Sequence, residues 1–387
     1  MRRKRICIIT GSRAEYGLIY WLIKEVKADQ DLELQLIVTG MHLSSEYGST
    51  YKEIEKDFKI RKKIDINLVS DTSVGISRSM GIAQTSFSQA FKELKPDLLV
   101  LTGDRYETFS AASSAMISKI PIAHIHGGEL TKGSWDDTIR HCISKMAHLH
   151  FTATEEYKKR VIQLGEQPSK VFNIGGMGIE SIKRLKLLSK IEFEKSIKFK
   201  LNTKNIIVTF HPSTLDNQSS KKQFKELLDA IKDLKDTNII FTKTNSDTGG
   251  KEINKMIDFY TSQHHENSIG IISLGHLRYL SALQYVDVVV GNSSSGILEA
   301  PSFKIGTINI GNRQEGRIKA KSVVDCKAKK KDILKSLNKI YSKNFQNMLS
   351  TVKNPYDNGL SSKKILKQLK KIKLDNILKK NFFNISF

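Results

Sequence analysis

Short apolar runs rich in β-branched residues recur along this chain of 387 residues, with amphipathic stretches between them. This alternation is typical of βαβ units, in which a crossover helix follows each strand of a parallel sheet. Candidate strands in the first half of the chain are Arg5–Thr10, Leu34–Thr39, Asp97–Thr102, Ile122–His126, His150–Ala153 and Val171–Ile174. Those in the second half are Asn205–Phe210, Asn238–Thr242, Gly270–Ser273, Asp287–Val290 and Thr307–Ile310. The pattern predicts an α/β protein with parallel sheets and right-handed crossovers.

A charged stretch with helical character and no strand character, Glu180–Lys204, separates the two sets of strands. We therefore predict two doubly wound, Rossmann-like domains, residues 1–180 and 181–353. The segment Asn354–Gly359 breaks the pattern, and a Lys/Leu/Ile stretch with helical periodicity follows it. We expect residues 354–387 to form a Lys-rich helix and tail. By analogy with other two-lobed α/β enzymes, we expect this segment to cross back to the N-terminal domain.

The formal net charge of +23 raises the question of a nucleic-acid partner. The lysines are spread along predicted helices and concentrate near the C-terminus, as in Lys327–Lys331 and Lys363–Lys373. The sequence contains no RNA-recognition or zinc-finger signature and no basic run interleaved with aromatic residues. The composition therefore favours a solvated basic surface that also attracts anionic substrates, and no nucleic-acid partner.

The sequence predicts a cytoplasmic protein with no membrane partner. No stretch approaches the roughly 20 apolar residues of a spanning helix. The first apolar run, Ile6–Ile9, is shorter than the h-region of about 7–15 residues in a signal peptide. Cys7, Cys142 and Cys326 are odd in number and far apart, which argues against a disulfide framework and a clustered zinc site.

The first predicted strand runs into the loop Gly11–Gly17 before a helix. Such a turn directs backbone N–H groups and the Arg13 guanidinium toward a phosphate. The loop has glycines only at its two ends and lacks Gly-Lys-Ser/Thr, which disfavours a dinucleotide-binding dehydrogenase and a P-loop NTPase. Arg13 is open to two interpretations, a ligand contact or a structural salt bridge.

Acidic and basic side chains follow the next strands. Asp104 and Arg105 come directly after the third strand, although a helix-capping role for Asp104 is an alternative. The next strand leads into His124–Glu129, with His126 and Glu129. Successive strand ends of an open α/β sheet meet at the edge where ligands bind, so these groups favour an acid–base site. The His-x-His pattern has no further ligand spacing, and we predict no metal.

The helix that follows this loop adds two acid–base pairs. One helical turn separates Asp136 from Arg140 and Asp137 from His141, so their side chains lie on one side of the helix. The cluster of carboxylates and histidines from successive strand ends supports the site interpretation over isolated core histidines.

The second half of the chain contains a predicted phosphate site at Val290–Glu299. A buried strand followed by serines and a helix start aims N–H groups, hydroxyls and the helix dipole at an anion, with Ser293 and Ser294 as candidates. Ser293 could instead be only an N-cap. Glu299 lies deeper on the same predicted helix and suits the two hydroxyls of a ribose.

Three further loops of this half carry polar groups at predicted strand ends. His211 follows the first strand, Lys243–Asp247 follows the second, and Gly311–Arg317 adds two guanidiniums suited to a diphosphate.

Seven motifs together give the sequence a specific resemblance to a known family. From Ile6 to about Asp325 the chain resembles the hydrolysing UDP-N-acetylglucosamine 2-epimerases of bacterial sialic-acid synthesis. The motifs are Thr10–Gly17, Val38–His42, Gly103–Arg105, His124–Glu129, Ile139–His141, Gly291–Gly296 and Asn309–Gly311.

The resemblance implies a GT-B-like fold with the active site in the cleft between two domains. It implies conversion of UDP-N-acetylglucosamine and water to N-acetylmannosamine and UDP, by elimination to 2-acetamidoglucal and hydration, with no cofactor. Such chemistry needs a base for the C2 proton, an acid, and cationic stabilisation of the departing diphosphate. A homo-oligomer, dimer or tetramer, is what the family suggests.

The match assigns roles to residues of this chain. The acid–base and sugar-contacting groups it implies are Asp104, His126, Asp136, Asp137 and His211. The substrate- and nucleotide-binding groups are Arg13, Arg105, Glu129, Asn245, His276, Ser293, Ser294, Glu299 and Arg313.

One position departs from many relatives, which carry a catalytic glutamate where this chain has His126. Other bacterial members resemble this chain in having histidine there. Histidine exchanges protons near neutral pH, so the role of this position as acid or base stays open, and Glu129 is the nearby carboxylate that could substitute. Relatives of the non-hydrolysing branch usually carry a lysine in the first loop where this chain reads Tyr16–Leu18, so its absence favours the hydrolysing branch.

Two alternatives share most of these motifs. One is a hydrolysing 2-epimerase for a UDP- or GDP-linked 2,4-diacetamido sugar on the way to legionaminic acid. The other is a glycosyltransferase of the same fold, which would need a sugar acceptor.

Overall fold

The computed structural model describes residues 2–68, 70, 72–132, 134–213, 219–244 and 249–385. The chain folds into two compact units. The first unit comprises Met1–Glu129, Asp136–Ser181 and Tyr356–Phe387, and the second comprises Leu130–Trp135 and Ile182–Pro355. No helix in these described ranges is long and apolar enough to cross a lipid bilayer.

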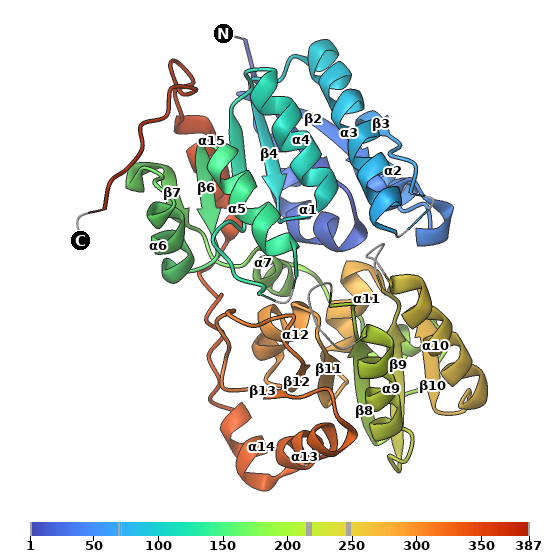
Figure 1. Cartoon of the computed structure of the whole chain (residues 1–387). Helices are drawn as coiled ribbons and strands as arrows, with labels where there is room; N and C mark the ends of the chain where they lie inside the picture. Colours follow the sequence, from blue (N-terminus) through green and yellow to red (C-terminus); the bar gives the residue numbers. More distant parts are fainter. Residues whose placement is uncertain are drawn as a thin grey trace. The chain divides into compact units, whose positions relative to one another are not determined.

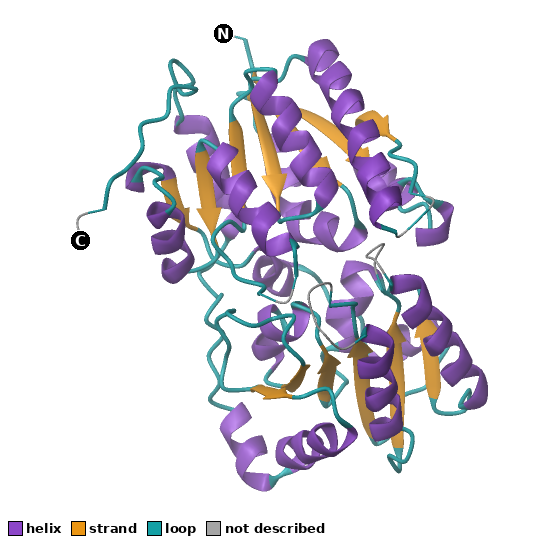
Figure 2. Ribbon diagram, in the orientation of Figure 1, coloured by secondary structure: helices purple, strands orange, loops and turns teal. Residues whose placement is uncertain are grey.

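The first unit is built on a seven-stranded parallel sheet in the order β3-β2-β1-β4-β5-β6-β7 (Figures 1 and 2). Its strands are β1 (Lys4–Thr10), β2 (Leu32–Thr39), β3 (Ile60–Ile64), β4 (Leu98–Thr102), β5 (Ile122–Ile125), β6 (Leu149–Thr152) and β7 (Val171–Asn173). Its α-helices are α1 (Arg13–Ala28), α2 (Tyr51–Asp57), α3 (Ser73–Leu94), α4 (Tyr106–Ile117), α5 (Asp136–Met146), α6 (Glu155–Gln163) and α15 (Ser361–Lys371). Short 3₁₀ helices are η1 (Gly40–His42), η2 (Ser45–Tyr47) and η3 (Pro168–Lys170).

Helix α7 (Met177–Arg184) leads from the first unit into the second. The second unit has a six-stranded parallel sheet in the order β10-β9-β8-β11-β12-β13. Its strands are β8 (Lys204–Thr209), β9 (Thr237–Thr242), β10 (Ser268–Ile271), β11 (Val288–Gly291), β12 (Gly306–Ile310) and β13 (Val323–Cys326). Its helices are α8 (Lys190–Ile197), α9 (Ser220–Ile231), α10 (Gly250–Gln263), α11 (Gly275–Ala282), α12 (Ser295–Leu298), η4 (Ala300–Phe303), α13 (Lys330–Tyr341) and α14 (Lys343–Leu349).

Both faces of the second sheet are buried, which explains why its strands read as continuous apolar runs. Alternate residues of a strand point to opposite faces. Ile206, Val208 and Val290 therefore belong to one core cluster, whereas Ile207 and Val289 belong to another. Parallel sheets covered by helices on both faces carry this pattern instead of an apolar–polar alternation.

Each sheet reverses its strand order at one point, between β1 and β4 in the first unit and between β8 and β11 in the second. In open parallel sheets, ligands bind beyond the carboxyl ends of the strands at such a switch point. The loops that follow these four strands contain Gly11, Asp104, His211 and Asn292. The topology therefore defines one ligand edge in each unit.

The two edge strands that sequence patterning missed are β3 and β13. Only Ile64 of β3 is buried, and no residue of β13 is. An edge strand with one covered side needs no continuous apolar run, so neither segment has the pattern used to predict the others. The prediction also extended β5 by one residue: the strand ends at Ile125, and His126 takes a left-handed backbone with φ of +67°.

Helix α15 packs against α1 in the first unit (Figure 1). Ile365 and Leu369 of α15 are fully buried in the same core cluster as Ile19 and Leu22 of α1. The segment 354–360 before it is an irregular stretch, as its sequence predicts.

The segment after α15 is bound to the first unit by an ion pair between the partly buried Lys380 and the buried Glu166. Lys380 Nζ lies 2.7 Å from Glu166 Oε2 and also donates to the carbonyls of Lys145 and Ala147. Burial opposes ionisation of Glu166, but hydrogen bonds from His150, Lys145 and Lys380 outweigh it and lower the pKa of this carboxyl to about 2.

Candidate active site

The ligand edge of the first unit is organised around Arg140, whose side chain on α5 is only 2% exposed. Its Nη1 donates to the carbonyl of Glu129 at 2.9 Å and lies 3.4 Å from Asp137 Oδ1. Its Nη2 forms an ion pair with Asp104. One buried guanidinium thus holds the loop after β4, the loop after β5 and the first turn of α5 together.

The two carboxylates that Arg140 contacts keep part of their surface open, since the side chains of Asp104 and Asp137 are each 24% exposed. Asp137 Oδ2 also lies 3.5 Å from His141 Nε2, as the one-turn spacing predicts. Asp136 begins the same helix, beside Asp137. A charged donor that fixes partly exposed carboxylates is suited to acid–base chemistry on a bound molecule.

His126 and Glu129 form a buried pair beside this cluster. His126 Nδ1 lies 2.7 Å from Glu129 Oε1, and the backbone N–H of Met177 points to His126 Nε2 at 3.4 Å. Because Nε2 accepts from an N–H group, the ring proton belongs on Nδ1, where it is donated to Glu129. This hydrogen bond joins His126, which stands where many relatives carry a glutamate, to Glu129, the carboxylate that could substitute for it.

His124 has a structural role, which is the ordinary fate of a histidine inside a strand. It is completely buried, with Nε2 2.7 Å from the carbonyl of Gly103 and Nδ1 3.1 Å from Ser144 Oγ. Burial lowers the pKa of this imidazole to about 3. His124 therefore stays neutral and supports the backbone that carries Asp104.

The loop after β1 begins with the capping residue Ser12, whose Oγ accepts from Glu15 N. Arg13 Nη2 forms an ion pair with Glu53 at 2.7 Å, which is one of the two interpretations its sequence position allowed. Glu15 accepts from the N–H of Gly11 at 2.7 Å, and burial raises the pKa of its carboxyl to about 8.

Arg105 is held by a carboxylate two residues along the chain. Its Nε donates to Glu107 Oε1 at 2.6 Å, and the Glu107 side chain is 1% exposed. Arg105 is also the N-cap residue of α4, without a side-chain cap bond. The ion pair fixes the direction in which this guanidinium leaves the helix start.

At the ligand edge of the second unit, two loops are joined by one amide side chain. Asn292 Oδ1 accepts from the N–H of His211 at 2.7 Å, and Asn292 Nδ2 donates to the carbonyl of His211 at 2.8 Å. Asn292 is 1% exposed and His211 is 8% exposed. The residue before this asparagine must be glycine, because Gly291 has φ of +136° and a Cβ there would lie 2.0 Å from the carbonyl oxygen of Thr209.

The alternative role of Ser293 as an N-cap is not what the structure shows, because Ser294 is the N-cap of the following helix. The helix itself, α12, has only four residues, which is shorter than predicted. Glu299 is the residue after α12 and stands at its end instead of deep within a longer helix. Since a macrodipole grows with aligned peptide units, a helix of four residues contributes little dipole at this loop, and N–H groups and hydroxyls are its main polar groups.

The hydroxyls of this loop are linked to each other. Ser293 Oγ lies 3.1 Å from Ser295 Oγ, which accepts from the Tyr279 hydroxyl at 2.6 Å. Burial raises the pKa of Tyr279 above its usual range, so the phenol remains a donor. Tyr279 thus orients the serine chain.

Arg313 and His276 both belong to the second unit. Arg313 Nη1 donates to the carbonyl of Asn292 at 3.2 Å, so the serine loop and the predicted diphosphate-binding guanidinium are directly connected. Burial lowers the pKa of His276, in the first turn of α11, to about 4. Asn245 lies outside the described residues. Among the described residues, no three His, Cys, Asp or Glu side chains are grouped as a metal site would require.

Sequence reasoning passed over three residues that organise these loops: Arg140, Asn292 and Tyr279. Arg140 was noted only as one turn from Asp136, whereas its contacts include Asp137 and Asp104. Asn292 stands inside a recognised motif, and a buried amide between a β-strand and a serine run was the available signal. Tyr279 carries no local signal, because its partner Ser295 is 16 residues away.

The ligand edge of the first unit carries a cluster of carboxylates and a guanidinium, and that of the second carries a serine-rich loop linked to an arginine. Two doubly wound units with such edges are typical of enzymes that act on nucleotide-activated substrates. The profile of the UDP-N-acetylglucosamine 2-epimerase family matches residues 24–370. The chain therefore belongs to this family.

Full-length relatives support the assignment. The chain is 45% identical to a GDP/UDP-N,N'-diacetylbacillosamine 2-epimerase (hydrolyzing) of Campylobacter jejuni, with 100% of both chains covered. It is 41% identical to the polysialic acid biosynthesis protein P7 of Escherichia coli, with 99% of this chain and 98% of that protein covered. It is 34% identical to a UDP-N,N'-diacetylbacillosamine 2-epimerase (hydrolyzing) of Legionella pneumophila, with 96% and 97% covered.

Solved structures agree on the fold. The UDP-GlcNAc 2-epimerase of Neisseria meningitidis, crystallised with UDP-GlcNAc, aligns with a TM-score of 0.78 at 19% identity and covers 95% of this chain and 100% of its own. The Methanocaldococcus jannaschii UDP-GlcNAc 2-epimerase, in complex with UDP-GlcNAc and UDP, aligns with a TM-score of 0.77 at 18% identity, covering 95% and 99%. The fold is thus GT-B-like, as predicted.

Proposed function

We propose that this protein is a hydrolysing epimerase that converts UDP-N-acetylglucosamine and water to N-acetylmannosamine and UDP, for sialic-acid biosynthesis. The observation that carries the proposal is the cluster around Arg140, which presents Asp104 and Asp137 together at the switch point of the first sheet. In the second unit, the connected serine loop and Arg313 suit a nucleoside diphosphate.

The reaction proceeds in two balanced steps. A base removes the proton at C2, the C–H electron pair forms the C1–C2 double bond, and the bond from C1 to the diphosphate oxygen breaks to release UDP. Water then adds its oxygen to C1 of the 2-acetamidoglucal, and an acid delivers a proton to the opposite face of C2. Both steps need positioned acid–base groups and cations beside the leaving diphosphate.

The first unit supplies the acid–base groups of this proposal. Asp104, Asp136 and Asp137 stand at the ligand edge, and the hydrogen-bonded pair of His126 and Glu129 adds an imidazole backed by a carboxylate. His211 of the second unit completes the set assigned by the family resemblance.

The nucleotide-binding groups of the proposal come mainly from the second unit. Ser293, Ser294 and Arg313 bind the diphosphate, and Glu299 binds the ribose hydroxyls. The remaining assigned contacts are His276, Asn245, Arg13 and Arg105. We further propose cytoplasmic action, in a compartment that keeps Cys7, Cys142 and Cys326 reduced, and assembly as a homo-oligomer.

A second substrate is favoured by one observation. The relative at 45% identity acts, by its name, on GDP- or UDP-linked N,N'-diacetylbacillosamine, a 2,4-diacetamido sugar, and a second relative shares that substrate name. The same chemistry at C1 and C2 serves both sugars, and the two substrates differ at positions away from these carbons, including the C4 substituent.

Separate incubations decide between the substrates. The purified protein is mixed in turn with UDP-N-acetylglucosamine and with UDP- and GDP-linked 2,4-diacetamido sugars, and free nucleotide and sugar are followed by NMR. We expect N-acetylmannosamine and UDP from the first, in water alone and without an acceptor sugar. If UDP-N-acetylglucosamine stays intact while a diacetamido analogue is consumed, the second substrate replaces the first.

Substitutions test the residue roles. Asp104→Asn and His211→Ala should lose roughly 10²–10⁴-fold in turnover, the usual contribution of a general acid or base, while both variants remain folded. Asp104→Asn should also lower the Tm, because it removes the charged partner of the buried Arg140 guanidinium. Ser294→Ala should weaken UDP binding by about 0.5–1.5 kcal/mol, one net hydrogen bond, measured by calorimetry against the exposed control Ser350→Ala. Near wild-type turnover in either of the first two variants removes that residue from the catalytic set.

A further inference from the structure

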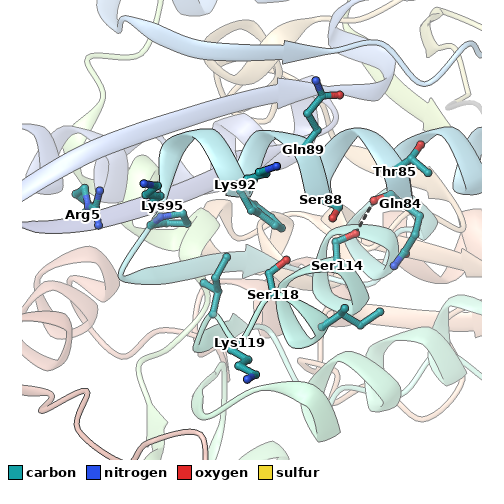
Figure 3. Close-up of a pocket in the computed structure, with 14 residues that line it drawn as sticks. Arg5, Gln84, Thr85, Ser88, Gln89, Lys92, Lys95, Ser114, Ser118 and Lys119 are labelled. Carbon is teal, nitrogen blue, oxygen red and sulfur yellow. Dashed lines mark hydrogen bonds between the residues drawn. The ribbon is translucent and has the colours of Figure 1, made fainter.

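A cavity lined by both polar and apolar side chains lies in the first unit, away from the ligand edge (Figure 3). It has a volume of about 970 Å³ and lies between the C-terminal half of α3 and the end of α4. Its volume is within the range of about 300–1,000 Å³ that small-molecule sites occupy.

The cavity is at the opposite end of the sheet from the candidate active site. Arg5 is the second residue of β1, Pro96 precedes β4, and Ile120 precedes β5. These are the amino ends of strands whose carboxyl ends carry Asp104 and the loop with His126. About 16 Å of strand, five residues at roughly 3.3 Å each, separates the two ends of β4. The cavity is therefore not a part of the acid–base cluster.

One end of the cavity is cationic. Arg5, Lys92, Lys95 and Lys119 line it, and none of its 14 lining residues is acidic. Arg5 is compensated by Asp97, with Nη2 3.4 Å from Oδ1. In the part of the chain that the structure describes, no carboxylate lies within ion-pair distance of the three lysines.

The negative ends of two helix dipoles offset only part of this positive charge. Lys95 is the C-cap of α3, and Lys119 follows the C-cap of α4. A helix C-terminus carries about half a negative charge, so the two ends offset about one of the three lysine charges. Roughly two positive charges then remain without compensation in a concave surface, where an anion would be attracted.

The other end of the cavity is polar and uncharged. Gln84, Thr85, Ser88 and Gln89 follow one another along α3 toward that end, as Figure 3 shows. From Gln84 to Lys95 the helix rises by roughly 16 Å, which gives the cavity room for a molecule with two chemically distinct parts. Hydroxyl and amide groups suit a polyol, and the lysines suit an anion with several acceptor oxygens.

We propose that this cavity binds a small phosphorylated sugar, with its phosphate among Lys92, Lys95 and Lys119 and its hydroxyls along Gln84–Gln89 of α3. The site is separate from the substrate site and does not depend on the proposed epimerase activity. A ligand here would be an effector or a product of another enzyme, since the acid–base residues lie at the other end of the strands.

Methyl NMR can observe the cavity directly, because two isoleucines line it. The protein is labelled at isoleucine methyl groups, and glucose 6-phosphate is added up to about 10 mM, which saturates even a millimolar site. We expect saturable shifts of the Ile117 and Ile120 signals. Ile297, buried beside the serine loop of the second unit, reports binding at the nucleotide loop separately. Unphosphorylated glucose should leave Ile117 and Ile120 unshifted.

A charge-matched pair of variants distinguishes a site from general attraction. Lys92→Glu/Lys119→Glu should weaken binding about tenfold or more, because it replaces two phosphate contacts. Lys335→Glu/Lys339→Glu makes the same change in net charge at exposed positions of α13 and should alter the affinity by less than about twofold. The methyl spectra also show whether each variant is folded.

Three results would overturn the proposal. The first is no saturable shift of Ile117 or Ile120, including the case in which only Ile297 responds. The second is equal weakening by the two double variants, which would show non-specific attraction by a basic surface. The third is equal binding of glucose, which would show that the phosphate is not recognised.

Discussion

Replacement of Arg140 by methionine tests the central claim about the first unit, that one buried guanidinium holds the acid–base cluster together. Methionine has a similar length and keeps much of the packing, but it removes the donors to Asp104, Asp137 and the carbonyl of Glu129. Asp104 and Asp137 then lose the cation that both contact, and the carbonyl of Glu129 loses a buried donor. We expect a large loss of stability in the first unit and loss of turnover.

The size of the effect follows from burial. A charge-assisted hydrogen bond such as that to the Glu129 carbonyl contributes about 1.5–3 kcal/mol. Removal of one partner of a buried ion pair costs about 3–5 kcal/mol. Because Asp104 and Asp137 are 24% exposed and keep some hydration, we expect less than the sum of these two contributions, about 3–5 kcal/mol in all. For a domain of this size, that corresponds to a fall in Tm of roughly 10 °C.

Calorimetry is the suitable assay, because a protein of two units need not unfold in one step. The shift should be confined to one of two transitions. Arg61→Met is the matched control: it breaks the ion pair to Glu33, whose partners are 38% and 37% exposed, and should cost at most about 1 kcal/mol. Arg140→Lys keeps the charge with a shorter reach and should lie between the two. If Arg140→Met lowers the Tm no more than Arg61→Met, the cluster does not depend on this guanidinium.

Three further predictions concern single contacts. Gly291→Ala should destabilise the second unit by more than about 3 kcal/mol, because its Cβ would clash with the carbonyl oxygen of Thr209. Gly81→Ala, where a Cβ on α3 meets open space, should stabilise the first unit by about 0.5–1 kcal/mol. Urea unfolding measures both changes. Lys380→Met should cost about 1–3 kcal/mol, against no measurable change for the exposed Lys379→Met, and an equal Tm for the two variants would contradict a role for the partly buried ammonium of Lys380. His124 has a pKa lowered to about 3, so the unfolded chain binds the extra proton below pH 6.5 and stability falls with acidity by up to about 1.4 kcal/mol per pH unit. His124→Gln should remove this part of the slope in melting curves between pH 7 and 5, and an unchanged slope would refute it.

The sequence predicted the elements whose physics is local. A strand buried on both faces needs an apolar run, so β1, β4, β8 and β11 could be located directly from the sequence. Since the ligand edge follows from strand order, the loops with Asp104 and His211 could also be placed. Strands β3 and β13 could not, because an edge strand obtains its hydrogen bonds from a neighbour and leaves little trace in its own residues.

The finer arrangement of the site depends on tertiary contacts that no local pattern encodes. Arg140 reaches Asp104, 36 residues away, and Tyr279 reaches Ser295, 16 residues away. The prediction of a full helix after the serine loop was wrong because Pro301 lies in a 3₁₀ turn that replaces its continuation. The proposed chemical roles remain predictions.

The packing of α15 on α1 has a consequence for how the protein is made. The core cluster that contains Ile19 and Leu22 of α1 also contains Ile365 and Leu369 of α15, which the ribosome adds only after the whole second unit. About 340 residues separate the end of α1 from these two side chains, so at translation rates of about 5–20 residues per second the apolar side of α1 remains uncovered for roughly 20–70 s. During that interval the second unit can already be complete, while the apolar side of α1 in the nascent first unit stays exposed to chaperones and proteases. Any chain released early would keep that surface, so quality control could recognise an unfinished copy by its first helix.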